Sequence, residues 1–295
     1  MCLAGTTETV PSHADATGTG ARRNLDRSGG ISRRSVLGAM ALAGGAVALG
    51  GPAAAAAPVG ARPSAVPKGR RLQDLTHIFR DGFRVYTFDP PSRRTVVTIP
   101  ENGFYSQEWT FTEHSGTHMD APGHFTEGGR LSPEILPEEL LVPIVVVDIS
   151  ARVASSPDEV VTVEDLVAFE HGFGRIPRGA LVCEYGGWDT RVGDPEAYRN
   201  VGADGLFHFP GFGLPALDWL LENREITGIG VDTLSLDNGP SQTFDVHVTL
   251  LGADKYGIEN LANLNGIPPR GASAFVGLIP WEEGSGGPCR VVASW

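Results

Sequence analysis

Cysteine is scarce in this chain, with three residues in 295. So small a number excludes a disulfide scaffold, because such folds depend on several bridges. Basic residues are also few, since 23 Lys and Arg stand against 35 Asp and Glu, for a formal charge of -12. This acidic balance argues against nucleic acid and against an anionic membrane as partners, because both are bound by clustered Lys and Arg.

The remaining composition is that of a globular protein. Hydrophobic residues make up 41% of the chain and charged residues 20%, which excludes a wholly disordered or fibrous chain. Glycine and proline are abundant, with 39 and 22 residues. They predict many turns and few long helices, and the sequence has no internal repeat.

The first part of the chain has the pattern of an export signal. Arg33 and Arg34 form a twin-arginine pair, and the following stretch over 36–57 is uncharged and rich in Ala and Gly. A transmembrane helix is the alternative, but the glycines and Pro52 weaken its transfer into lipid. We expect an N-terminal extension and twin-arginine signal peptide over 1–57, a linker over 58–70 and one domain over 71–295.

This signal predicts the location of the mature protein. Export by the twin-arginine route would place it outside the cell or in the periplasm or cell envelope, with no membrane attachment after cleavage. Cleavage would remove Cys2 and leave Cys183 and Cys289. Whether these two cysteines pair is left open by the sequence.

The mature region alternates strand and helix patterns in its second half. Buried or β-branched runs predict strands, and amphipathic runs with helix-starting residues predict helices. Together they predict a mixed α/β domain rather than a plain doubly wound sheet. The expected strands cover 84–88, 95–99, 104–112, 142–148, 180–183, 226–231 and 274–279, and the expected helices cover 162–169, 214–223 and 245–251.

One segment over 113–125 concentrates groups that bind metals. It holds three of the eight histidines, and its candidate ligands occupy even-numbered positions, which share one face of an extended strand. An ideal strand would hold positions 114 and 118 roughly 13 Å apart. We therefore expect a bend at Gly116 and a second bend at Pro122 and Gly123. The candidate ligands are His114, His118, Asp120 and His124.

Neutral imidazoles with a carboxylate are a usual ligand set for a divalent catalytic metal. Such a metal lowers the pKa of its water toward neutrality and so provides hydroxide. The alternative is that these histidines cap turns and satisfy backbone groups. That alternative is the stronger one for a single histidine and the weaker one for a His-x3-His-x-Asp-x3-His pattern.

The segment from His114 to Phe125 resembles the signature of the metal-dependent cyclase family, which includes bacterial kynurenine formamidases and isatin hydrolases. A second block supports the resemblance, with Asp232 and Asp237, then His247, then Glu259. The resemblance implies a swivelling β/β/α domain, with a mixed sheet and flanking helices. It also implies a homodimer or homotetramer.

The resemblance implies roles for individual residues. His114, His118 and Asp120 match metal ligands, and His124 matches a proton-transfer residue or a second-metal ligand. His247 and Glu259 match further catalytic residues, although by itself His247 is more often a packing or capping residue. Trp188 follows Gly186 and Gly187 and so resembles the Gly-Trp element that lies beside the substrate in the family. A tryptophan after two glycines could equally cover the hydrophobic core. His208 either lines the substrate pocket or is structural.

These observations predict an exported hydrolase that opens a cyclic amide, an aryl-formamide or a lactone with water activated by a metal. The expected cofactor is zinc or manganese, as one or two ions, and the expected partner is a small-molecule substrate. The alternative is a non-enzymatic metal- or ligand-binding protein on the same scaffold. Such a protein would keep the ligands and lose the proton-transfer residues.

Overall fold

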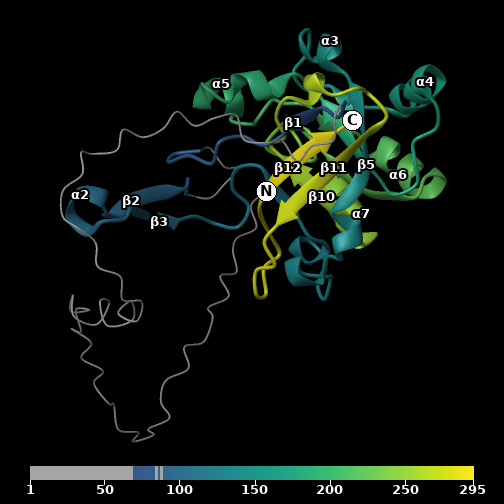
Figure 1. Ribbon diagram of the computed structural model, residues 1–295. Coiled ribbons are helices and arrows are strands. Elements are labelled where there is room, and N and C mark those ends of the chain that lie inside the picture. The colour runs from purple at the N-terminus through teal and green to yellow at the C-terminus, as the bar shows by residue number, and fades with distance from the viewer. Residues whose placement is uncertain (1–68, 84–85, 87–88) are drawn as a thin grey trace, which may run out of the picture. The chain divides into compact units, whose positions relative to one another are not determined.

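The structure is a computed structural model that describes residues 69–83, 86 and 89–295 (Figure 1). The twin-arginine motif, the cleavage region and all but the end of the linker lie outside the described residues. The strand expected over 84–88 also lies outside the described residues, except for Tyr86. Within the part of the chain that is described, no helix is long and apolar enough to cross a membrane.

A mixed sheet of eight strands forms the centre of the fold. Its order is β1-β12-β11-β5-β7-β9-β10-β4, and β4 pairs in addition with β12, so the sheet closes on itself. The closed, barrel-like sheet confirms the expected mixed α/β class. The strands are β1 (Leu72–Asp74), β4 (His118–Asp120), β5 (Leu141–Asp148), β7 (Ala180–Tyr185), β9 (Ile226–Gly230), β10 (Tyr256–Glu259), β11 (Ala272–Leu278) and β12 (Gly286–Ser294).

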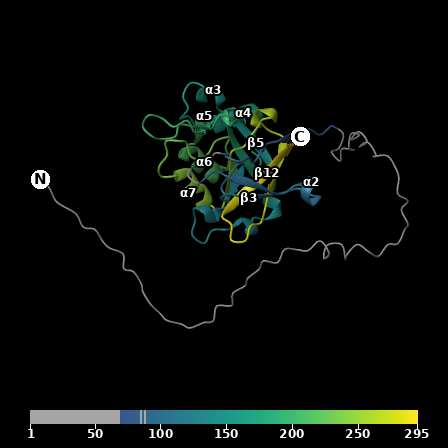
Figure 2. The same ribbon diagram turned by 90° about the vertical axis from the view of Figure 1, so that its left-hand side faces the viewer.

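The strands β5, β7, β9 and β10 run parallel, and helices cover the outer face of this half of the sheet. Long helices are α4 (Val163–Phe173), α6 (Leu214–Asn223) and α7 (Asp245–Gly252), which confirms the three expected helices. Thr162 caps α4 by accepting a hydrogen bond from the backbone N–H of Asp165. Figure 2 shows α6 and α7 on the side of the sheet away from β12.

Alternation along the parallel strands produces two hydrophobic cores. In β5, Val145 and Val147 face the helices, whereas Ile144 and Val146 face the interior of the closed sheet. The second core also contains Cys183 and Cys289, which are free, buried thiols. Because β11 and β12 have their inner faces in this core, their outer faces point away from the helices.

A hairpin of β2 (Ser92–Val97) and β3 (Ser106–Thr110) forms a separate two-stranded sheet. The strand expected over 95–99 was wrong at its C-terminal end, because β2 ends at Val97 and a helix begins at Ile99. Pro100 lies in the first turn of a short helix, α2 (Ile99–Asn102), because proline fits a helix start but breaks a strand. The other short elements are α3 (Ser150–Val153), β6 (Val160–Val161), α5 (Pro195–Arg199) and β8 (Gly211–Phe212).

Candidate functional site

The short strand β4 lies between β10 and β12 and carries two of the expected ligands. His118 is the register partner of Glu259 in β10, and Asp120 is the partner of Gly286 in β12. A Cβ atom on Gly286 would lie 2.2 Å from the carbonyl oxygen of Met119, so only glycine permits this close approach. The closure of the sheet thus places residues distant in sequence around β4.

The bend expected at Gly116 is confirmed, since its φ of 68° lies in the left-handed region. It turns the chain so that His114 folds back beside β4. The His114 and His118 rings then lie 5.4 Å apart between centroids, and His114 Nδ1 is 2.7 Å from Asp120 Oδ1.

His118 and His247 are each anchored by the nitrogen that faces away from the centre of the site. His118 Nδ1 donates to the carbonyl oxygen of Gly116 at 2.9 Å, and His247 Nδ1 donates to Asp237 Oδ2 at 2.6 Å. Both partners accept hydrogen bonds, so in the neutral rings they fix the tautomer that leaves a lone pair on each inner Nε2. Outer partners of this kind are typical of metal-ligating histidines.

His114 is anchored by a chain of two hydrogen bonds. Ser285 Oγ donates to Glu113 Oε1 at 2.5 Å, so it accepts the hydrogen of His114 Nε2 at 2.9 Å. In the neutral ring this leaves a lone pair on Nδ1, which faces Asp120 Oδ1. Two acceptors that face each other need a proton or a cation between them.

The three inner nitrogens converge on two buried carboxylates. His118 Nε2 lies 3.3 Å from Asp120 Oδ1 and 3.4 Å from Glu259 Oε2. His247 Nε2 lies 3.5 Å from Asp120 Oδ2 and 3.0 Å from Glu259 Oε1. Asp120 Oδ2 is buried and has no hydrogen-bond partner among the described residues. Such an orphaned oxygen fits a cation that would lie beside it.

Two groups of side chains hold their candidate ligand atoms within 4.8 Å of one another. Asp120 belongs to both groups and offers one oxygen to each. This donor set of imidazole nitrogen and carboxylate oxygen suits a divalent metal such as zinc or manganese. The first group is His114, His118 and Asp120, and the second is Asp120, His247 and Glu259.

The buried carboxylates of the site favour the charged form of the nearby imidazoles. Burial opposes a charged imidazole, but Asp120 and Glu259 outweigh burial and raise the pKa of His118 to about 9. Burial also opposes the charge of His247, whose pKa is raised by its hydrogen bonds to carboxylates. Burial raises the pKa of Glu259, as does the charge of Asp120.

His124 ends a 3-10 turn over Pro122–His124 and belongs to neither ligand group. Its ring stacks on His114 at 3.7 Å between centroids, with an angle of 22° between the planes. Burial lowers the pKa of His124 to about 4, so the ring is neutral near pH 7. His124 is therefore an uncharged imidazole that lines the edge of the site.

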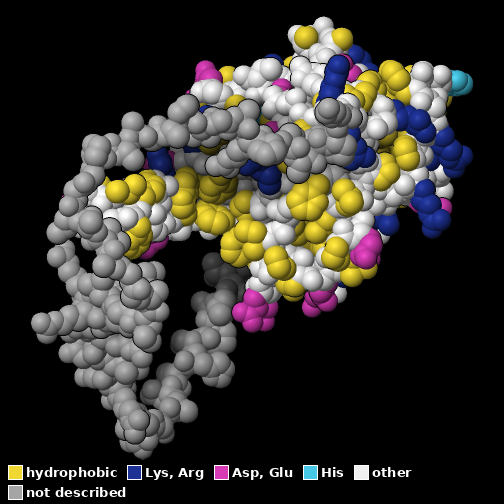
Figure 3. Space-filling view, viewed as in Figure 1, with side chains coloured by type: hydrophobic (Ala, Val, Ile, Leu, Met, Phe, Trp, Pro, Cys, Tyr) yellow, Lys and Arg dark blue, Asp and Glu magenta, His cyan; other side chains and the backbone are white. Residues whose placement is uncertain are grey.

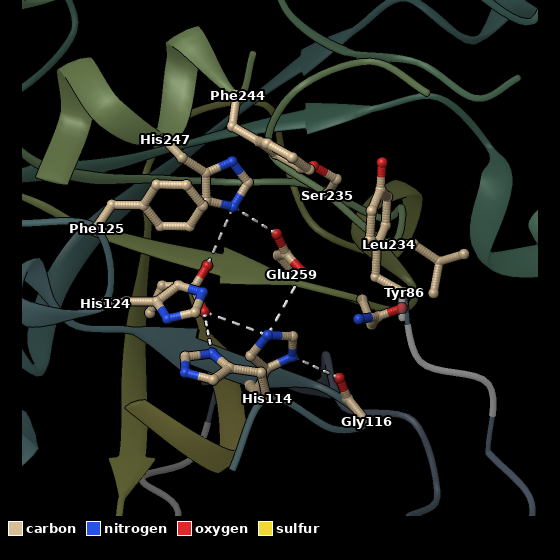
Figure 4. Close-up of a pocket in the computed structure, with 13 residues that line it drawn as sticks. Tyr86, His114, Gly116, His124, Phe125, Leu234, Ser235, Phe244, His247 and Glu259 are labelled. Atoms are coloured by element: carbon tan, nitrogen blue, oxygen red, sulfur yellow. Dashed lines mark hydrogen bonds and ion pairs between the residues drawn. The ribbon is translucent and has the colours of Figure 1, made fainter. Parts of the chain in front are cut away.

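The site opens into a cavity of ≈ 340 Å³, whose polar end is formed by the histidines and carboxylates (Figure 4). Its other walls are largely apolar. Phe244 has a φ of 52°, which is unusual for a bulky residue, and it precedes α7. Sequence reasoning gave these wall residues no role, although Phe125 lies in the first recognised motif and Leu234, Ser235 and Asn260 lie in the second block. They are Tyr86, Phe125, Leu234, Ser235, Phe244 and Asn260.

The structure does not bring Trp188 and His208 into this cavity. Trp188 is fully buried in the core beside the helices, and its indole N–H donates to the carbonyl oxygen of Tyr198. His208 lies between two carboxylates, with Nδ1 2.8 Å from Asp158 and Nε2 3.2 Å from Asp204. Both side chains therefore have structural partners away from the site.

Comparison with known proteins agrees with this geometry. The Cyclase family, described as "Putative cyclase", matches residues 73–238. "Isatin hydrolase" of Roseibium aggregatum is 33% identical over 199 residues, which cover 64% of this chain and 75% of that protein. "Kynurenine formamidase" of Bordetella petrii is 26% identical over 195 residues, which cover 60% of this chain and 82% of that protein.

A solved structure shares the fold. "Isatin hydrolase A" from Ralstonia solanacearum superposes with a TM-score of 0.72 at 34% sequence identity, and the match covers 76% of this chain and 92% of that one. Because the family match spans more than half of the sequence, the chain belongs to the Cyclase family.

Proposed function

We propose that this protein is an exported metal-dependent hydrolase that opens the C–N bond of a cyclic amide or an aryl-formamide, or the ester bond of a lactone. One observation carries the proposal. Three imidazoles, each anchored at its outer nitrogen, direct their inner nitrogens at two buried carboxylates. The names of the relatives support the substrate class, because isatin is a cyclic amide and N-formylkynurenine is an aryl-formamide.

The two ligand groups would hold one or two zinc or manganese ions, with Asp120 shared between them. A divalent cation, when bound, supplies Lewis acidity and makes water nucleophilic at neutral pH. The outer hydrogen bonds of His118 and His247 keep their tautomers fixed, so both rings retain a lone pair for the cation.

The chain's own residues would bind the substrate and move protons. The aromatic wall formed by Tyr86, Phe125 and Phe244 suits a flat, apolar ring beside the reacting carbonyl. His124 would take a proton from the attacking water and deliver it to the leaving nitrogen or oxygen. His124 lines the cavity and belongs to neither ligand group, so its ring nitrogens would stay free to exchange a proton with the substrate.

We further propose that the protein leaves the cell by the twin-arginine route and works as a homodimer or homotetramer. The motif at Arg33 and Arg34 supports the first statement. This route would carry the protein in its folded form, which allows metal uptake before export.

A substrate panel tests the proposal. The protein is loaded with zinc or manganese and assayed on isatin, N-formylkynurenine and simple lactones. Hydrolysis of at least one substrate class is expected, with loss of the activity in His118→Ala. Binding without turnover of every compound would contradict the proposal and favour a non-enzymatic ligand-binding protein.

A further inference from the structure

The cavity beside the ligand groups has an apolar end. The rings of Phe125 and Phe244 lie 5.8 Å apart between centroids, and the ring of Tyr86 lies 5.6 Å from Phe244 (Figure 4). Leu234 completes this wall and is buried. The volume of ≈ 340 Å³ is near the lower end of the range of about 300–1,000 Å³ for ligand pockets, so the cavity suits a small ring system.

Two polar side chains beside this wall are uncharged. Ser235 Oγ is buried and has no hydrogen-bond partner among the described residues, which fits a partner atom on a bound ligand. The amide of Asn260 also lines the cavity. A hydroxyl and an amide can bond to a neutral oxygen of the ligand, such as a carbonyl, but neither balances a full charge.

No Lys or Arg of the described residues lines the cavity. A group of arginines lies instead on the surface near the ends of α4 and α6, where Figure 3 shows Lys and Arg side chains at one edge of the molecule. Two of these arginines have acidic partners, since Arg178 pairs with Glu225 at 2.7 Å and Arg224 pairs with Glu170. A carboxylate on the ligand would therefore find no cation of the described residues at the apolar end.

We propose that the cavity selects substrates that carry no charge outside the reacting group. Cyclic amides, lactones and simple aryl-formamides meet this condition. N-formylkynurenine does not, because its side chain ends in an ammonium and a carboxylate. An ion moved from water to an apolar wall loses its hydration and gains no partner, which weakens binding. This inference rests on the proposed function, since it defines the substrate of the same site.

A matched pair of substrates separates charge from size. Isatin-5-carboxylate and isatin-5-carboxamide have nearly the same shape and differ by one charge, and isatin itself gives the reference value. With the metal-loaded protein, kcat/KM of the carboxamide should be close to that of isatin, and kcat/KM of the carboxylate should be lower by about 100-fold or more. Each value is divided by the rate constant for hydrolysis by hydroxide alone, which removes differences in the reactivity of the ring. N-formyl-2-aminoacetophenone and N-formylkynurenine form the corresponding pair of aryl-formamides.

A cation introduced into the wall should weaken the selection. Phe125 lines the cavity and is 38% exposed, so a lysine at this position can keep its ammonium hydrated at the opening. Phe125→Lys should raise the ratio of kcat/KM for the carboxylate to that for the carboxamide by about 3-fold or more, because it offers an opposite charge. Phe125→Met is the control, since methionine is unbranched like lysine and has no charge, and its ratio should equal that of the wild type.

The outcomes separate this inference from the proposed function. A carboxylate that is hydrolysed as fast as the carboxamide would overturn the selection by charge, whether or not both are slower than isatin. An unchanged ratio in the Phe125→Lys protein would overturn it as well. If no compound is turned over, the proposed function fails. The dissociation constants of the same compounds, measured by calorimetry, then still test the selection, and equal values for the charged and neutral members would overturn it.

Discussion

His118 and Glu259 face each other across the antiparallel pair of β4 and β10, with Nε2 and Oε2 3.4 Å apart. Cross-strand partners on one face are natural neighbours, so the pairing brings together two candidate ligands that lie far apart in the sequence. The shared carboxylate of Asp120 lies next to both. The register of β4 against β10 therefore places these three side chains together.

Removal of a ligand and removal of the proposed base should have different effects. His118→Ala should lose bound metal, because it deletes an inner nitrogen of the first group. His124→Ala should keep the metal and lose about 10²- to 10⁴-fold in rate, since that is the usual contribution of a general base. Metal content by mass spectrometry and turnover on one substrate measure both effects. Equal metal loss in the two variants would instead make His124 a ligand.

Ser285 should tune metal affinity without touching the metal. Ser285→Ala removes the acceptor that fixes His114 Nε2, so the ring can adopt the wrong tautomer. Affinity should fall by about 10- to 100-fold, as is usual for outer partners of ligands. Competition with a chromophoric chelator measures the change. Thr190→Ala is the control, because the Thr190 hydroxyl donates to the carbonyl oxygen of Gly187 outside the cavity, and its loss should leave the affinity nearly unchanged.

The close approach of β12 to β4 should be sensitive to a single methyl group. Gly286→Ala would place a Cβ 2.2 Å from the Met119 oxygen and 2.7 Å from His114 Cε1. Overpacking of this kind typically costs about 1–3 kcal/mol. Urea denaturation should show that loss, together with weaker metal binding. Gly193→Ala is the matched control, since nothing lies within 4 Å of its added Cβ, and an equal loss there would contradict the explanation.

A buried pair of acids behind the site should make stability depend on pH. Glu184 is fully buried without a hydrogen-bond partner among the described residues, and burial together with Asp232 raises its pKa well above the usual value. Burial and the charge of Asp189 raise the pKa of Asp232 to about 7. The charge of Asp148 also raises the pKa of Glu184.

The sign of the effect follows from these raised pKa values. The folded state holds protons that the unfolded state releases above about pH 4, so this contribution to stability is lost as pH rises toward about 7. Glu184→Gln removes one titrating group. Its free energy of unfolding, relative to the wild type, should increase between pH 4 and pH 8. A constant difference between the two proteins across that range would contradict the prediction.

Much of the fold was predictable because its signals are local. The apolar runs of β5, β7 and β9 and the amphipathic patterns of α4 and α6 predicted elements at the correct positions. The His114–His124 segment likewise contains the first group that could hold a metal, and the bend at Gly116 followed from residue type.

Other features depend on contacts that leave no local pattern. The closure of the sheet joins β4 to β12, so no periodicity near His114 points to Ser285. The cavity wall includes Phe244, whose position depends on its left-handed backbone before α7. Trp188 had the sequence surroundings expected of a substrate contact, yet its indole packs in the core.

Metal removal tests the central claim most directly. The protein is dialysed against a strong chelator until no metal remains, assayed on the substrate that it hydrolyses best, and then titrated with zinc or manganese. We predict that activity disappears with the metal and returns on addition of one or two equivalents, while Asp120→Ala neither binds metal nor recovers. Full activity in the metal-free protein would contradict the account.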